Sequence, residues 1–165
     1  MSSQWRAHVA DLYRRHAASV YRRALSLLGQ EAEAHEVLQD IFVSLLERPD
    51  QFEGRSTMST YLYGATTHAC LNRLRNQRNR TRLLAQQQAV RGPAAEVPSD
   101  HLLRVRHALE RLPSVLAEVA VYYYVDELSH QEIADVLGCS RRHVGDLLER
   151  LEIWGREQEA TCSPN

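Results

Sequence analysis

The segment of residues 56–82, STMSTYLYGATTHACLNRLRNQRNRTR, divides into two different faces when it is placed on a helix. Residues three and four apart lie on the same side of a helix. One side is small and mostly apolar, so it can pack on a core: Leu62, Tyr63, Thr66, Ala69, Cys70 and Leu74. The other side, here called the polar stripe, carries aromatic, amide, imidazole and guanidinium groups: Tyr61, Gly64, His68, Asn72 and Arg75. Such a stripe suits a ligand with flat rings and phosphates, as single-stranded nucleic acid has.

The charge around this helix is strongly segregated. Residues 55–95 contain seven arginines and no acidic residue, whereas residues 31–53 contain seven acidic residues and one arginine. The net charge of the whole chain is only −1, so a nucleic-acid site has to come from such local segregation. The alternative is that residues 73–82 are the solvated end of a helix. A solvated face usually mixes both signs of charge, and this one does not.

The composition excludes several classes of site. The chain has 165 residues, of which 44% are hydrophobic, enough for one domain or two small ones. Its three cysteines form no CxxC pair and its eight histidines no HExxH motif or Cys/His cluster, so no disulfide framework, metal or cofactor is predicted. No catalytic constellation stands at usable spacing, which predicts a protein that is not an enzyme. Without a signal peptide or a long apolar run, we expect a cytoplasmic protein with no membrane insertion.

Two helices are predicted before the polar stripe. Apolar residues recur at helical spacing over residues 5–28, and Gly29 suits a C-terminal cap. A second helix over residues 32–47 has one wide apolar face and ends before Pro49. Its opposite face carries Glu36, Gln39, Asp40, Val43 and Glu47. Acidic residues on an exposed face usually serve solvation only.

Residues 83–101 have the composition of a flexible linker, with two prolines, a glycine and no apolar periodicity. A loop of this length is unusual inside a compact domain, so the chain is predicted to form two domains. Beyond the linker we expect a short helix over residues 102–111. Another helix, capped by Ser114 and running to Val125, is almost wholly apolar and is expected to be buried in a second core.

Residues 128–151, LSHQEIADVLGCSRRHVGDLLERL, have a helix-turn-helix pattern. Ser129 and Glu132 fit a capping box, Gly138 permits a tight turn, and Ser140 can cap the second helix. Arg141 follows in the first turn of that helix, with Arg142 and His143. A helical hairpin with a purely structural role is the alternative.

The three residues after Ser140 are cationic or titratable, although the helix dipole disfavours cations at a helix start. First-turn residues of a recognition helix reach base edges and phosphates in a major groove, and Arg is a good donor to both. Asp146 and Glu149, on the same surface, would repel phosphate unless Asp146 accepts a hydrogen bond from a cytosine amino group.

Several ungapped motifs resemble one protein family. Residues 33–42, EAHEVLQDIF, are similar to DAEDLVQEVF, and residues 52–75, FEGRSTMSTYLYGATTHACLNRLR, to FRGxSSFRTWLYRIARNLALDRLR. ALERLP and ELSHQEIADVLGCS complete the resemblance, which is to the small extracytoplasmic-function group of bacterial RNA polymerase sigma factors. It implies an all-α protein of two small helical domains: region 2 over residues 1–82, a three- to four-helix bundle; a flexible linker over 83–101; region 4 with the helix-turn-helix over 102–158; and a disordered tail over 159–165.

The resemblance also implies a function and its residues. A sigma factor has no catalytic residues of its own, binds the clamp and flap of core RNA polymerase, and directs it to promoter DNA. An anti-sigma factor is a further expected partner. The residues implied in polymerase binding are Glu36, Gln39, Asp40 and Val43. Those implied in binding the −10 element as a single strand are Ser56, Thr57, Met58, Tyr61, His68, Asn72, Arg73, Arg75 and Arg78. Those implied in binding the −35 duplex are Ser140, Arg141, Arg142, His143, Asp146 and Arg150.

The chain departs from the family pattern at several of these positions. Tyr61 stands where the family commonly has Trp, His68 where it often has Asn, and Gly64 and Thr67 where it often has Arg. Two other functions are therefore weighed against a working sigma factor. One is a helix-turn-helix regulator that binds duplex DNA without polymerase. The other, favoured by the loss of basic residues at Gly64, Thr67 and Leu147, is a sigma-like interaction module that titrates a partner.

Overall fold

A computed structural model describes residues 3–87 and 100–162 of the chain, and these residues form helices and connecting turns without any strand. The elements are α1 (Ser3–Leu28), α2 (Glu31–Glu47), the 3-10 turn η1 (Pro49–Gln51), α3 (Met58–Gln87), α4 (Asp100–Arg111), α5 (Ser114–Ala120), the π-helical turn η2 (Val121–Val125), α6 (His130–Leu137) and α7 (Arg141–Cys162). The predicted all-α class is confirmed. None of the helices in the described ranges has the length and apolarity needed to cross a membrane.

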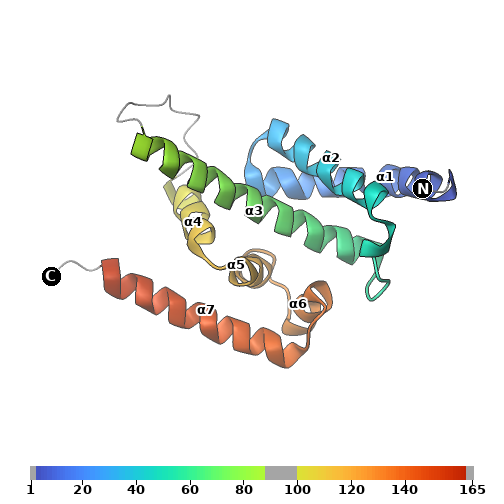
Figure 1. Cartoon of the computed structure of the whole chain (residues 1–165). Coiled ribbons are helices and arrows are strands. Elements are labelled where there is room, and N and C mark those ends of the chain that lie inside the picture. The colour runs from blue at the N-terminus through green and yellow to red at the C-terminus, as the bar shows by residue number, and fades with distance from the viewer. Residues whose placement is uncertain (1–2, 88–99, 163–165) are drawn as a thin grey trace.

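The N-terminal unit, α1 to α3, is a packed group of three helices (Figure 1). Gly29 turns the chain between α1 and α2 with φ 71°, a left-handed conformation that glycine adopts without strain, so the predicted cap is confirmed. The indole N–H of Trp5 donates to the carbonyl of Leu45 at 3.0 Å and ties the start of α1 to the end of α2. The core of this unit contains Val9, Leu12, Val20, Ala24, Leu28, Val37, Leu38, Ile41, Phe42, Leu45, Leu62, Cys70 and Leu74.

The C-terminal unit, α4 to α7, contains the predicted helix-turn-helix in α6 and α7. Ser129 and Glu132 form both hydrogen bonds of a capping box at the start of α6. Gly138 ends α6 in the left-handed conformation with φ 66°, and Ser140 accepts a hydrogen bond from the backbone N–H of His143 at 3.2 Å. All three local predictions are confirmed. Leu116, Val119, Ile133, Val144, Leu147, Leu148 and Leu151 are buried in this unit.

The helix ends differ from the predicted boundaries. α3 continues past Arg82 to Gln87 and α4 begins at Asp100, so both ends of the predicted linker are helical, while residues 88–99 lie outside the described residues. α7 continues to Cys162, so the prediction of a disordered tail from residue 159 is wrong for the described part of that tail. Both extensions contain strong helix formers, Leu-Leu-Ala-Gln-Gln in α3 and Glu-Gln-Glu-Ala in α7. Propensity therefore extends these helices beyond the point where apolar periodicity stops.

The predicted apolar helix from Ser114 to Val125 is also corrected. Ser114 is the first residue of α5 and makes no capping bond, because Pro113 occupies the N-cap position. The last turn widens into the π-helical η2, which rotates its side chains relative to a regular α-helix. Tyr122 is fully buried, but Tyr123 and Val125 are 38% and 57% exposed, so the prediction that both lie in the core is wrong.

The two units pack against each other. α3 contacts α1 and α2 on one side and α4, α5 and α6 on the other, as Figure 1 shows. The buried apolar side chains of both units accordingly belong to one connected cluster. α3, which carries the polar stripe, is therefore the central element of the molecule.

Candidate nucleic-acid interface

The residues predicted to bind a −35 duplex lie together on the exposed side of α7. Val144, Leu147 and Leu148 bury the inner side of this helix against the C-terminal unit. The candidate residues on its outer side are all exposed: Ser140, Arg141, Arg142, His143, Asp146 and Arg150. Within the described part of the chain, Arg141, Arg142 and Arg150 take part in no ion pair. The start of α7 thus presents unpaired cations on a helix that is held rigidly by its cap and its core.

The residues predicted to bind a −10 strand fall into three groups on α3 and the turn before it. The first group lies at the start of α3: Ser56, Thr57, Met58 and Tyr61. The hydroxyl of Thr57 accepts a hydrogen bond from the backbone N–H of Thr60 at 3.1 Å, so this residue caps the helix. Tyr61 is half-buried, which raises the pKa of its phenol, and its ring meets Phe52 edge-on with centroids 5.4 Å apart. Phe52 is an aromatic neighbour that the sequence analysis did not assign to the site.

The second group, His68, Asn72 and Arg75, faces the C-terminal unit. His68 Nδ1 lies 2.6 Å from Glu118 Oε1 on α5, and its Nε2 lies 2.8 Å from Asn72 Nδ2. Arg75 donates to Asn72 Oδ1 at 2.8 Å and to the carbonyl of Leu112, after α4, at 3.4 Å. These three polar side chains, predicted to meet DNA, are in contact with the chain's own second unit.

The third group is set by Arg73, which points to α2. Its guanidinium donates to Glu36 Oε2 at 2.6 Å and approaches Asp40 Oδ2 at 3.5 Å. Glu36 and Asp40 are two of the residues predicted to bind polymerase, and they remain largely exposed. The structure therefore joins two predicted sites that the sequence analysis treated as separate. Arg78, farther along α3, is exposed.

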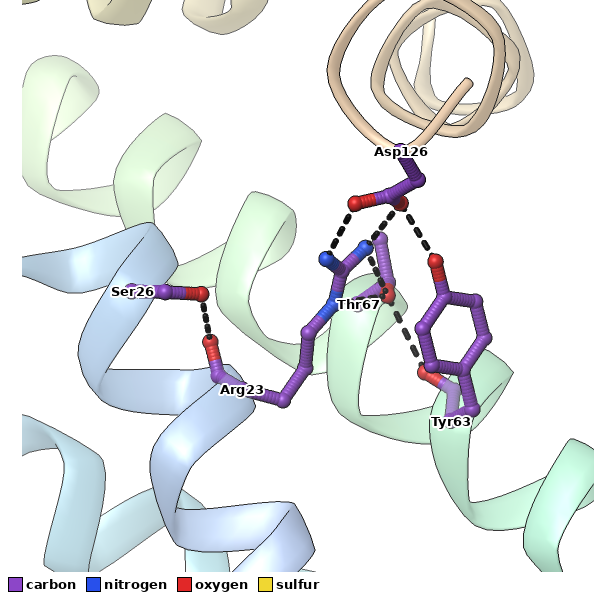
Figure 2. Close-up of polar contacts among 5 residues, drawn as sticks. All are labelled: Arg23, Ser26, Tyr63, Thr67 and Asp126. Carbon is purple, nitrogen blue, oxygen red and sulfur yellow. Dashed lines mark hydrogen bonds and ion pairs between the residues drawn. The ribbon is translucent and has the colours of Figure 1, made fainter. Parts of the chain in front are cut away.

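A buried polar cluster joins the two units and is here called the interdomain latch: Arg23, Tyr63, Thr67 and Asp126 (Figure 2). Arg23 on α1 donates to both carboxylate oxygens of Asp126, after η2, at 2.6 Å each. Its guanidinium also donates to the Thr67 hydroxyl at 3.1 and 3.2 Å and lies 4.5 Å from the centre of the Tyr63 ring. The Tyr63 hydroxyl donates to Asp126.

The side chains of Arg23 and Asp126 are only 13% and 14% exposed, so solvent screens this pair weakly. Burial by itself would lower the pKa of Arg23, but the hydrogen bond and charge of Asp126 outweigh it and the pKa is raised. Burial raises the pKa of the Tyr63 phenol, which therefore stays protonated as a donor. The sequence analysis missed the latch, because Arg23 and Asp126 are 103 positions apart and no local motif connects them.

Gly64 permits a close approach of α6 to α3. A Cβ atom at this position would lie 3.2 Å from Cγ1 of Val136 and 3.6 Å from the Val136 carbonyl oxygen. Any longer side chain at residue 64 would therefore push α6 away. This contact lies in the middle of the polar stripe, between Tyr61 and His68.

Comparison with known proteins identifies the family. The family model for Sigma-70 region 2 matches residues 12–80, and that for Sigma-70 region 4 matches residues 102–151, which together make up more than half of the chain. The chain belongs to the sigma-70 family. It is a sigma factor of the extracytoplasmic-function type, which directs RNA polymerase in transcription initiation, and the resemblance inferred from the sequence is confirmed. Sigma factors are in general regulators rather than enzymes.

Two curated proteins of Bacillus subtilis (strain 168) are similar to this sigma factor along most of their length. RNA polymerase sigma factor YlaC is 25% identical over 155 residues, which cover 90% of each chain. ECF RNA polymerase sigma factor SigW is 25% identical over 145 residues, covering 79% of this chain and 76% of SigW. Among solved structures, CnrH in complex with the cytosolic domain of CnrY has a similar fold, with a TM-score of 0.51, 22% identity and coverage of 96% of this chain and 91% of that one.

Proposed function

We propose that this sigma factor contacts promoter DNA through two surfaces and RNA polymerase through a third. The exposed side of α7 binds the −35 duplex, the start and polar stripe of α3 bind the −10 strand, and the outer side of α2 binds the polymerase clamp. The observation that carries this proposal is the row of exposed, unpaired basic residues at the capped start of α7. In this division, region 2 ends with α3 and region 4 begins with α4.

The proposal for α7 rests on its rigidity and its charge. Backbone N–H groups at the start of a helix already favour phosphate, and Arg141 and Arg142 add cations that no carboxylate in the described residues neutralises. An arginine in this turn can donate two hydrogen bonds to one guanine edge. Asp146, one turn farther on, lies on the same exposed side and can accept from a cytosine amino group. These donors and acceptors suit reading of a duplex rather than phosphate contact alone.

The proposal for α3 rests on stacking and charge. Tyr61 and Phe52 form an aromatic pair beside Met58, the kind of surface on which unstacked bases pack. Exposed arginines farther along the helix, at residues 78, 80 and 82, can follow the phosphates of the same strand. His68, Asn72 and Arg75 would join this surface once the C-terminal unit moves away from them.

The proposal for α2 rests on an exposed ridge next to the core. Glu36, Gln39, Asp40 and Val43 all lie on the outer side of the helix, and Val43 is an apolar side chain that is 49% exposed. An apolar residue among exposed acids is suited to bind a basic and partly apolar surface of the clamp. Arg73 pairs with Glu36 and Asp40, so polymerase has to compete with this arginine or use the carboxylate oxygens that it leaves free.

Further expectations about partners belong to this proposal. We expect region 4 to contact the polymerase flap, the protein to act in the cytoplasm and the chain to have no catalytic activity of its own. We also expect a protein that holds the sigma factor in check, an anti-sigma factor, because the similar structure of CnrH is a complex with the cytosolic domain of CnrY.

Run-off transcription tests this proposal. Core polymerase is incubated with and without the sigma factor on fragmented DNA of its own source, and new start sites are mapped. We expect new starts that share two upstream elements, and we expect Arg141→Ala with Arg142→Ala to abolish them. Arg156→Ala is the matched control, because it removes an exposed arginine from the other end of α7. If the double variant started transcription normally, the assignment of α7 would be wrong. Duplex binding without any retention on polymerase would favour a stand-alone regulator.

A further inference from the structure

The part of α3 assigned to the −10 strand is covered by the protein's own C-terminal unit. His68 contacts Glu118, Arg75 contacts the Leu112 carbonyl, and Gly64 lies against Val136. We propose that the free sigma factor is held in a closed, autoinhibited state, in which the interdomain latch keeps region 4 on the polar stripe. This inference rests on the proposed function of α3.

The latch has the properties of a specific closure. Arg23 and Asp126 come from different units, so their two hydrogen bonds form only when the units meet at one register. Separation of the units returns both charges to water, and the pair therefore gains little over hydrated charges. Loss of one partner is different, because the closed state would then bury an unpaired charge. The latch thus makes closure depend strongly on Asp126 while it leaves opening accessible to a competing partner.

The fit around Gly64 gives a second and independent contribution. Without a side chain at residue 64, α6 approaches α3 so closely that even a Cβ atom would be 3.2 Å from Val136. The Tyr63 and Tyr122 rings pack beside this contact with centroids 5.6 Å apart. A backbone position this close to a neighbouring helix has no room for the long basic side chain that a purely DNA-binding stripe could carry. Gly64 is thus suited to close packing between the units.

The closed state leaves the −35 surface free. Arg141, Arg142 and His143 are exposed while the polar stripe is covered. The free protein should therefore bind duplex DNA through α7 but bind a single strand only in the minor, open fraction. Its apparent affinity for the single strand is reduced by that fraction, and any partner that separates the units restores it.

The experiment compares Asp126→Ala with Asp135→Ala. Asp126 lies outside all three proposed binding surfaces, and Asp135 is an exposed aspartate of α6 whose printed partner is Gln131 on the same helix. Small-angle scattering reports the radius of gyration of each full-length protein. Fluorescence anisotropy reports binding of a labelled mixed-sequence single-stranded oligodeoxynucleotide. We expect Asp126→Ala to be more extended than the wild type and to bind the single strand about tenfold more tightly, and Asp135→Ala to match the wild type.

A second variant guards against a folding defect. Val136→Arg inserts bulk against Gly64 without touching the latch, and it should produce the same expansion and the same gain in single-strand binding. Equal duplex binding by all variants would show that region 4 is intact. The inference is overturned if both variants stay as compact as the wild type, or if they expand without any gain in single-strand binding. In the latter case Arg75→Ala separates the two failures: if it still impairs promoter opening by the holoenzyme, the proposed function of α3 survives, and if it does not, that function fails too.

Discussion

The start of α7 and the middle of α3 carry similar side chains in opposite circumstances. Both helices present arginine and histidine, and both were predicted from the sequence to bind DNA. Arg141 and Arg142 are exposed and take part in no ion pair within the described residues, whereas His68 and Arg75 contact the C-terminal unit. Arg73 is paired with the acids of α2. Sequence pattern thus predicts what a surface can bind, but only the packing of the chain decides whether that surface is available.

The largest expected effect concerns the open surface. Replacement of both Arg141 and Arg142 by Ala should weaken binding to a −35 duplex at least about tenfold, because each arginine that reaches a base edge contributes about 1–3 kcal/mol. Binding should be measured by anisotropy on duplexes taken from mapped promoters, over a range of salt concentrations. Arg156→Ala, with the same charge change per residue at the other end of α7, should alter affinity less than about twofold. Equal losses in both variants would mean that charge, and not position, determines binding.

The covered surface should respond in a different assay. Tyr61→Ala removes an aromatic ring that can stack on an unpaired base, a contact of about 1–3 kcal/mol. We expect impaired promoter opening by the holoenzyme, followed by permanganate reactivity of unpaired thymines, with unchanged binding of the −35 duplex. Tyr13→Ala is the control, since Tyr13 is also an exposed aromatic of the N-terminal unit but lies on α1. Normal opening by Tyr61→Ala would contradict the assignment of this part of α3.

A smaller effect is expected from the cap that orients the helix-turn-helix. Ser129→Ala removes a side-chain oxygen that accepts from the backbone at the start of α6, and loss of such a cap typically costs about 1 kcal/mol. Urea unfolding should show this loss without a change in the structure of the N-terminal unit. Ser26→Ala, on the exposed surface of α1, should cost less. If both variants were equally stable, the capping box would contribute nothing to the fold.

The smallest expected effect is a dependence on pH. Hydrogen bonds from Ser129 hold the pKa of Glu132 below its ordinary value. A lowered pKa in the folded state means that this stabilisation is present above the unfolded pKa of about 4.3 and is lost as the pH falls through the folded value. Glu132→Gln should therefore lower the melting temperature at pH 7 and lower it less in acid below about pH 4. A difference that is the same at both pH values would exclude this role for the carboxylate.

Local structure could largely be predicted from the sequence, because its causes are local. The cap at Gly29, the capping box at Ser129, the turn at Gly138 and the cap at Ser140 each depend on residues a few positions apart. The exposed side of α7 was predictable for the same reason. The buried residues that support it follow from helical periodicity alone.

The interface between the units could not be predicted in this way. His68 and Glu118 are 50 positions apart and Arg23 and Asp126 are 103 apart, so no spacing rule joins them. The exposure of Tyr123 was missed because a single π-helical turn changes which side chains face the core. Gly64 read as a weak point in a DNA-binding stripe, whereas in the structure it is the position that lets α6 approach.

The most direct test of the closed state is a distance between the two units, measured in the free sigma factor and again in the holoenzyme. Spin labels on cysteines introduced at Arg22 of α1 and Glu152 of α7, both exposed, would report it by pulsed electron paramagnetic resonance, with Cys139 and Cys162 changed to Ser and Cys70 left in the core. We expect one narrow distribution of short distances in the free protein and a shift to longer distances on binding core polymerase. The same distribution in both states, or a broad one in the free protein, would contradict a closed state held by the latch.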